Sequence, residues 1–309
     1  TDALTFALHL LGVKRGDEVI TAPNSFIASV AAIVHLGAIP VFVDVLPDQN
    51  INPFLIENAI TKKTKAIMPV HLTGRISEMK EILKISKKYK IPVVEDAAQS
   101  IGSLHHKMPA GSIGDVGCFS AHPLKNLNAM GDSGYLTTNN LKIYNKIKEL
   151  RSHGMINRNK VKSFGYVSRM DNIQASILNF RIKKLKNTII KRRKNFELYK
   201  KYLDPKNIFF PVEKNYQFNS YHTFVIQVKN RNKLKRYLEI NNITTAIHYP
   251  IPIHLQPAAN YLGYKRGSFK MAEYQAKEIL TLPINQYLKK KEIEFISNKV
   301  NYFYSKNQN

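Results

Sequence analysis

The sequence predicts an α/β fold in which helices cover both faces of a mostly parallel central sheet, followed by a small α+β domain. Two observations carry this prediction. Short apolar segments alternate with segments of helical periodicity along the first part of the chain, as in βαβ units. The apolar segments also lack a regular polar alternation, which is typical of strands buried on both faces of a sheet. At 309 residues the chain is long enough for one large core and a smaller second domain.

The first predicted domain spans residues 1–203 and opens on an apolar helix at 3–11, for which Thr1-Asp2 supplies N-cap chemistry. Its short apolar segments are predicted strands: 18–21, 41–44, 66–70, 92–95, 116–120 and 134–138. Between them, 26–36 and 78–89 have helical periodicity, and Asn52-Pro53 is typical of a helix start. A long helix over 171–203 leaves this domain, and Asp204-Pro205 ends it.

The second predicted domain spans residues 204–309 and mixes strands with helices. Its predicted elements are a strand at 223–228, a helix at 231–241, a strand at 244–248, and helices near 269–280 and 290–304. No segment approaches the length of an apolar transmembrane helix. Apolar residues make up 44% of the chain and charged residues 22%, which indicates an ordinary soluble globular protein.

The single cysteine and the net charge bear on location and partners. Cys118 lies in an apolar stretch and is predicted to be buried and inert; one cysteine excludes an internal disulfide and fits the cytoplasm. The net charge of +25 allows a nucleic-acid partner. However, the densest basic run, 183–201, has apolar residues at helical spacing: Leu178, Ile182, Leu185 and Ile189. A solvated outer helix face is therefore favoured over an RNA-binding surface.

Polar residues at the carboxyl ends of two predicted strands are the first candidates for a site, because open α/β sheets bind ligands there. Asp96 lies at the end of the fourth strand. From this position alone, two roles are equally supported: the carboxylate caps a helix, or it points into a crevice. Lys125 lies beyond the fifth strand, where a lone lysine is normally a surface residue. The glycines of Gly131-Asp132-Ser133-Gly134 require a tight backbone just before the next strand, and the combination favours a site.

Taken together, short motifs along nearly the whole chain resemble those of the sugar-aminotransferase family of pyridoxal-phosphate (PLP) enzymes. This is the DegT/DnrJ/EryC/StrS type, related by fold to aspartate aminotransferase (fold type I). The motifs are Thr1-Asp2-Ala3-Leu4, 16–20, 40–44, Pro69-Val70-His71-Leu72-Thr73-Gly74, Glu95-Asp96-Ala97-Ala98-Gln99, 114–120, His122-Pro123-Leu124-Lys125-Asn126, 151–154, Ser168-Arg169-Met170-Asp171 and 254–257. No single motif is decisive; their shared order and spacing carry the resemblance.

The resemblance implies a role for each residue of the cofactor site. Lys125 holds PLP as an imine and then acts as acid and base in a 1,3-proton shift. Asp96 pairs with the pyridine nitrogen and keeps it protonated, so that the ring is an electron sink. Phe26 stacks on the ring, although a helix-core role is nearly as well supported. Gln99 reaches the phenolic oxygen or its neighbourhood.

The phosphate and the substrate are assigned in the same way. The amides of Asp2 and Ala3, the Thr1 hydroxyl and Ser120 bind the phosphate at a helix N-terminus. His248-Tyr249 matches a segment near the sugar, and a packed turn before Pro250 is an equally supported alternative. The remaining histidines lack metal-site spacing, and no metal is expected.

Three departures from the family pattern stand out. Relatives carry a further N-terminal segment of several dozen residues; Val167 replaces a common asparagine, and Ser133 a common glycine. The resemblance implies a homodimer whose segment 151–169 reaches the neighbour's cofactor. With Val167 unable to hydrogen-bond, Arg169 is the expected polar contact. The alternative is a mobile surface loop with Arg169 held by Asp171.

The sequence therefore predicts a cytoplasmic transaminase that moves an amino group, from glutamate, to a keto group of a nucleotide-linked sugar. The expected setting is amino-sugar and surface-polysaccharide synthesis, including lipopolysaccharide. A minority of the family has histidine in place of the lysine and dehydrates its substrate; Lys125 argues against that branch. The other hypothesis is a non-catalytic PLP-binding relative, or a basic nucleic-acid-binding relative, on the same fold.

Overall fold

The computed structural model describes residues 1–306, and at its centre two three-stranded sheets lie edge to edge. The strands are β1 (Glu18–Thr21), β2 (Ile39–Phe42), β3 (Thr64–Ile67), β4 (Val94–Asp96), β7 (Val116–Ser120) and β8 (Gly134–Thr137). Their order is β2-β1-β3 and β4-β7-β8, and parallel bridges at Ile67–Val93 and Val70–Asp96 join the two halves. Only β8 is antiparallel to its neighbour. The predicted mostly parallel sheet is confirmed.

Successive residues of a strand point to opposite sides of the sheet. Because apolar residues occur on both sides, helices cover both faces. Val19 and Ala66 pack with one hydrophobic cluster, whereas Ile20 and Ile67 pack with another. The first cluster includes residues of α1 (Asp2–Leu10), α2 (Ile27–His35) and α5 (Leu141–Leu150); the second includes residues of α3 (Pro53–Ile56) and α4 (Met79–Tyr89). Cys118 is buried in the first cluster, as predicted.

The C-terminal part has its own core around an antiparallel sheet. The elements of this part are β11 (Ile208–Phe209), β13 (Phe224–Val228), β14 (Ile279–Leu282), α7 (Arg231–Ile240), α8 (Lys270–Glu278) and α9 (Lys290–Lys306). The long α6 (Asn172–Tyr202) crosses to it, and its final turns contribute Phe196 and Tyr199 to this core. Phe269 and Ala272, by contrast, pack on the central sheet. The division at residue 203 stays a prediction.

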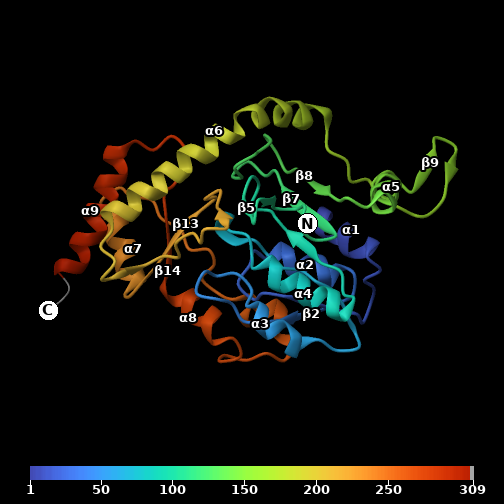
Figure 1. Ribbon diagram of the computed structural model, residues 1–309, viewed down its shortest axis with the longest axis horizontal. Helices are drawn as coiled ribbons and strands as arrows, with labels where there is room; N and C mark the ends of the chain where they lie inside the picture. The colour runs from blue at the N-terminus through green and yellow to red at the C-terminus, as the bar shows by residue number, and fades with distance from the viewer. Residues whose placement is uncertain (307–309) are drawn as a thin grey trace.

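Two short sheets lie outside these cores. One contains β5 (Leu104–His105), β6 (Met108–Pro109) and β12 (Gln217–Phe218); the other is the hairpin of β9 (Met155–Asn157) and β10 (Lys160–Val161). The hairpin projects beyond α5, away from the rest of the chain (Figure 1). We call residues 151–169, which include this hairpin, the arm. No helix within residues 1–306 is long and apolar enough to cross a membrane.

Three predicted details are wrong. Residues 244–248 form no strand, since only Ala246 makes a bridge, to Thr281. The helix predicted over 269–280 ends at Glu278, and residues 279–282 pair with β13 as β14. A continuous apolar run is compatible with a buried strand or a helix end, and long-range pairing decided between them. Ile182, predicted on the inner face of α6, is 53% exposed, whereas Leu178 and Ile189 are buried.

Candidate active site

Asp96 occupies the last position of β4 and is buried, with 3% of its surface exposed. Its Oδ2 accepts a hydrogen bond from the Ser29 hydroxyl at 2.7 Å, and its Oδ1 accepts one from the Ala98 amide at 3.2 Å. None of the ion pairs found within residues 1–306 involves Asp96. A buried carboxylate is costly unless a cation or donors satisfy it. Asp96 therefore fits a site that receives a positively charged or N–H-bearing ligand.

Lys125 lies on the loop that follows β7, the strand next to β4. Its backbone amide donates to the His122 carbonyl, and Asn126 ties the loop to the Ser220 carbonyl at 3.1 Å. Burial lowers the pKa of the Lys125 ammonium, and the negative charge of Asp96 offsets part of that effect. The structure thus brings together the two residues on which the cofactor assignment rests. A lysine with a lowered pKa has more of the unprotonated amine that attacks carbonyl groups.

Gln99 and Tyr249 lie beside each other near Asp96. The Gln99 Oε1 accepts a hydrogen bond from the Thr73 amide at 2.8 Å, which leaves the Gln99 NH₂ group to donate, and the Gln99 side chain also hydrogen-bonds to Tyr249. Burial raises the pKa of the Tyr249 hydroxyl to about 12, and the charge of Asp96 adds to this rise. The rings of Phe26 and Tyr249 are 5.9 Å apart, and Phe26 remains 56% exposed. Phe26 is therefore not a core residue, and its ring is free to contact a ligand.

Two histidines also face Lys125. The His248 Nδ1 lies 2.9 Å from the Thr281 hydroxyl, and burial together with the charge of Lys125 lowers the pKa of His248. Burial lowers the pKa of His222 further, and Lys125, Arg192 and His248 contribute. Both imidazoles are therefore neutral at neutral pH. The His222 Nδ1 is buried and has no hydrogen-bond partner within residues 1–306. No local sequence pattern marks His222, so its place in the site could not be predicted from sequence.

The first turn of α1 contains the predicted phosphate ligands. Thr1 is the N-cap residue, and the Ala3 carbonyl accepts a bond from the Cys118 thiol at 3.4 Å, which places this turn beside β7. Ser120 ends that strand. The first amides of a helix have no partner within the helix, and they bind anions well. The Asp2 carboxylate is engaged elsewhere, because it accepts a bond from the Ser168 hydroxyl at 2.6 Å.

Arg169 follows Ser168, the residue that donates to Asp2. It is exposed and forms no ion pair with Asp171 within the described chain, so the proposed anchoring of the arm by Asp171 is not found. The neighbouring Val167 is 62% exposed. The described residues also include no group of three or more His, Cys, Asp and Glu side chains able to hold a metal.

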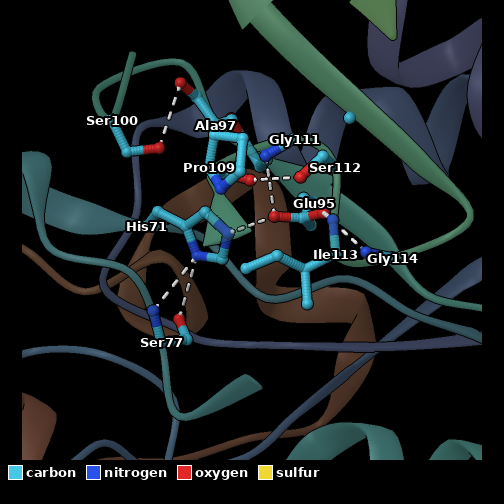
Figure 2. A network of polar contacts seen from close by, with 12 residues as sticks. His71, Ser77, Glu95, Ala97, Ser100, Pro109, Gly111, Ser112, Ile113 and Gly114 are labelled. Carbon is cyan, nitrogen blue, oxygen red and sulfur yellow. Dashed lines mark hydrogen bonds and ion pairs between the residues drawn. The ribbon is translucent and has the colours of Figure 1, made fainter. Parts of the chain in front are cut away.

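A buried polar network supports the strand that carries Asp96. Figure 2 shows Glu95 between the ring of His71 and three backbone amides. The His71 Nε2 lies 3.0 Å from the Glu95 carboxylate, and the His71 Nδ1 accepts a bond from the Ser77 amide at 3.2 Å. The amides that donate to Glu95 are those of Gly111, Ile113 and Gly114, at 2.8, 2.7 and 2.6 Å. Glu95 thereby ties β4 to the loop at 111–114 and to the turn at 71–77.

We expect Glu95→Gln to destabilise the fold by about 3 kcal/mol at pH 7. Burial raises the pKa of Glu95, but the hydrogen bonds from His71, Gly114 and Gly111 outweigh burial and lower it overall. A glutamine would turn its NH₂ group toward one of these donors. Because the pKa is lowered by folding, the stabilisation is present above the ordinary glutamate pKa and is lost as pH falls through the lowered value.

Urea unfolding at pH 7 and in acid checks this expectation, with the partly exposed Glu81→Gln as the matched control. The difference between wild type and Glu95→Gln is expected to shrink toward low pH. A difference under about 0.5 kcal/mol at pH 7, the usual size of a surface effect, would contradict the supporting role of Glu95.

Comparison with known proteins assigns this arrangement to a family. The sequence profile of the DegT/DnrJ/EryC1/StrS aminotransferase family matches residues 1–301. The chain is 38% identical to a dTDP-3-amino-3,6-dideoxy-alpha-D-galactopyranose transaminase from Aneurinibacillus thermoaerophilus, over 98% of this chain and 83% of that protein. It is also 38% identical to a "pleiotropic regulatory protein" from Geobacillus stearothermophilus, with the same coverage.

The structure gives the same result as the sequence comparison. It is similar to that of DesV from S. venezuelae in complex with a ketimine intermediate, with a TM-score of 0.95 and 33% identity over 98% of this chain and 82% of DesV. Pyridoxal phosphate is the cofactor that the family and its structures indicate. The chain belongs to the DegT/DnrJ/EryC1/StrS aminotransferase family.

Proposed function

We propose that the protein transfers an amino group from glutamate to a keto group of a nucleotide-linked sugar, with PLP held by Lys125. The observation that carries the proposal is a desolvated lysine near a buried carboxylate that forms no ion pair within residues 1–306. These residues fit the cofactor chemically. PLP supplies a carbonyl that condenses with amines and a ring that withdraws electrons when its nitrogen is protonated.

Each residue of the chain has a separate task in this proposal. Lys125, whose pKa is lowered, accepts and returns the proton that moves during amino transfer. The Asp96 carboxylate would accept a hydrogen bond from the ring nitrogen. The NH₂ group of Gln99, oriented by Thr73, donates to the phenolic oxygen. Phe26 covers the ring, and Ser120 with the first turn of α1 binds the phosphate.

The substrate class follows from the names of the related transaminases and from the site itself. His248 lies near Lys125 and Tyr249 near Asp96 and Gln99, and both supply neutral polar groups for sugar hydroxyls. The test is to add glutamate to the purified PLP-loaded protein and to follow its visible absorbance. Loss of that band with glutamate, and its return with a keto-sugar nucleotide but not with the free sugar, supports the proposal. A band that no amino donor alters would contradict it.

The alternative is a protein that binds PLP or nucleic acid without catalysis, and one relative is named as a regulatory protein. The net charge of +25 is compatible with nucleic-acid binding, but most lysines of α6 lie on an exposed helix face, as solvated charges usually do. Binding of random-sequence RNA or DNA at physiological salt, together with a glutamate-insensitive spectrum, would favour this alternative.

We also propose that the enzyme works in the cytoplasm, in the synthesis of amino sugars for surface polysaccharides such as lipopolysaccharide. A single buried cysteine is consistent with a reducing compartment. Deletion of the gene, followed by analysis of surface sugars for the loss of one amino sugar, tests this setting.

We further propose that two chains form a homodimer with the active site at their interface. Apolar side chains stand exposed beside Lys125 and on the arm, including Leu124 at 77% and Phe164 at 100% exposure. Exposed apolar groups in such number indicate a protein contact. A two-fold copy would cover them and bring the partner's arm to the cofactor, where Arg169 is the candidate polar contact.

We therefore expect sedimentation to give about twice the mass of one chain. Mixing an inactive Lys125→Ala chain with an inactive chain that lacks residues 151–169 should restore activity, because each mixed dimer then contains one complete site. The separate variants serve as controls. A fully active monomer, or proven mixed dimers without activity, would contradict a shared site.

A further inference from the structure

Ser29 is the only side chain that hydrogen-bonds to Asp96 within residues 1–306. It lies on α2, one helical turn after Phe26, and only 2% of its surface is exposed. Its Oγ lies 2.7 Å from the Asp96 Oδ2, across 67 residues of sequence. The helix α2 and its N-cap residue Phe26 therefore supply both the aromatic ring that borders the site and the hydroxyl that contacts the buried carboxylate.

Within residues 1–306 the Ser29 hydroxyl makes no hydrogen bond other than the one to Asp96. The surrounding residues of α2, including Val30, Ala32 and Ile33, are buried and apolar. A hydroxyl buried in apolar surroundings costs free energy unless it is bonded. The bond to Asp96 supplies that compensation, so it fixes the hydroxyl as a donor to the carboxylate.

The bond also determines what remains of Asp96 for a ligand. An ionised carboxylate has about four lone-pair positions. Ser29 occupies one on Oδ2, and the Ala98 amide occupies one on Oδ1. The two donors fix the plane of the carboxylate from both sides.

We propose that Ser29 is a positioning residue that holds the Asp96 carboxylate aimed at the ring nitrogen of PLP. The inference deepens the proposed function and rests on the role of Asp96 in it. Ser29 does not touch the cofactor in this proposal; it acts through Asp96 alone. Its removal is therefore expected to weaken only those properties that depend on the protonated ring nitrogen.

The first test compares Ser29→Ala with Ser29→Thr in the full-length PLP-loaded protein. Removal of one hydrogen bond to a charged group is expected to weaken PLP affinity about tenfold. Ser29→Thr retains the hydroxyl and is expected to restore most of that affinity. The control is Ser297→Ala, which removes a fully buried hydroxyl on α9 that has no hydrogen-bond partner within residues 1–306. The unfolding temperature of each apo variant shows whether folding is affected.

The second test separates positioning from general damage to the pocket. In 1-deaza-PLP a C–H group replaces the ring nitrogen, so Asp96 has no proton to hold. Wild type and Ser29→Ala are expected to bind this analogue with equal affinity. In the Asp96→Asn background, Ser29→Ala is expected to add less than about a twofold change, because coupled residues are not additive.

Two outcomes would overturn the inference. One is wild-type PLP affinity in Ser29→Ala, and the other is an equal loss of affinity for PLP and for the analogue. Both are distinguishable from failure of the proposed function. If Asp96→Asn itself binds and transfers like wild type, the role of Asp96 fails. If Asp96→Asn is impaired while Ser29→Ala is not, only the role of Ser29 fails.

Discussion

Lys125→Ala is expected to abolish amino transfer and the visible absorbance of the lysine-linked cofactor while leaving the fold intact. No other lysine within residues 1–306 shares its combination of burial, a lowered pKa and the charge of Asp96. Lys125→Arg is expected to fail as well, because a guanidinium stays protonated and forms no link to a carbonyl. Absorbance spectra and turnover with glutamate measure both variants.

Stability provides an independent readout of the same variant. Burial lowers the pKa of Lys125, so the unfolded chain binds its proton more tightly than the folded chain. This difference disfavours folding at neutral pH and disappears as pH rises through the ordinary lysine pKa. The apo Lys125→Ala protein is therefore expected to be at least as stable as wild type at pH 7. Lys62→Ala, at an exposed lysine, is the matched control. Full turnover in either Lys125 variant would refute the central assignment.

Asp96→Asn is expected to bind PLP yet to transfer amino groups more slowly by about two orders of magnitude or more, in the range of a lost electrostatic contact to the reacting group. The substitution is nearly isosteric, and an asparagine Oδ1 still accepts the bond from Ser29. It removes the negative charge that holds the proton on the ring nitrogen. Single-turnover kinetics with glutamate measure the step directly. The exposed Asp204→Asn is the matched control, and a near-wild-type rate in Asp96→Asn would exclude this role for Asp96.

Much of the fold could be predicted because most strands can be recognised from local sequence patterns. Apolar segments buried on two faces, such as 116–120, differ from helices in length and in their flanking residues. Residues 279–282 show the limit of this reasoning. Their apolar run continues the period of α8, and only pairing with β13, more than 50 residues earlier, makes them a strand. The local sequence does not reveal pairing with a strand so far away along the chain.

Some residues of the candidate site could likewise be predicted from sequence, and others could not. Asp96 and Lys125 could be paired from sequence, because adjacent parallel strands place their carboxyl ends at one edge of a sheet. Phe26 and Gln99 followed from motifs. His222 could not be found, since it approaches Lys125 only when β13 and its preceding turn pack against the loop after β7. The contact between the arm and a neighbouring cofactor remains a prediction, because it involves a second chain.

The sequence by itself determined the order of strands and helices, the choice of lysine, and the family resemblance, all of which depend on residue type and spacing along the chain. The tertiary structure alone decided which polar groups support the site. It turned the Ser29 hydroxyl toward Asp96, fixed the Gln99 amide through Thr73, and placed two neutral histidines around Lys125. The physical reason is that hydrogen bonds and desolvation act over a few ångströms in space, whatever the distance along the chain.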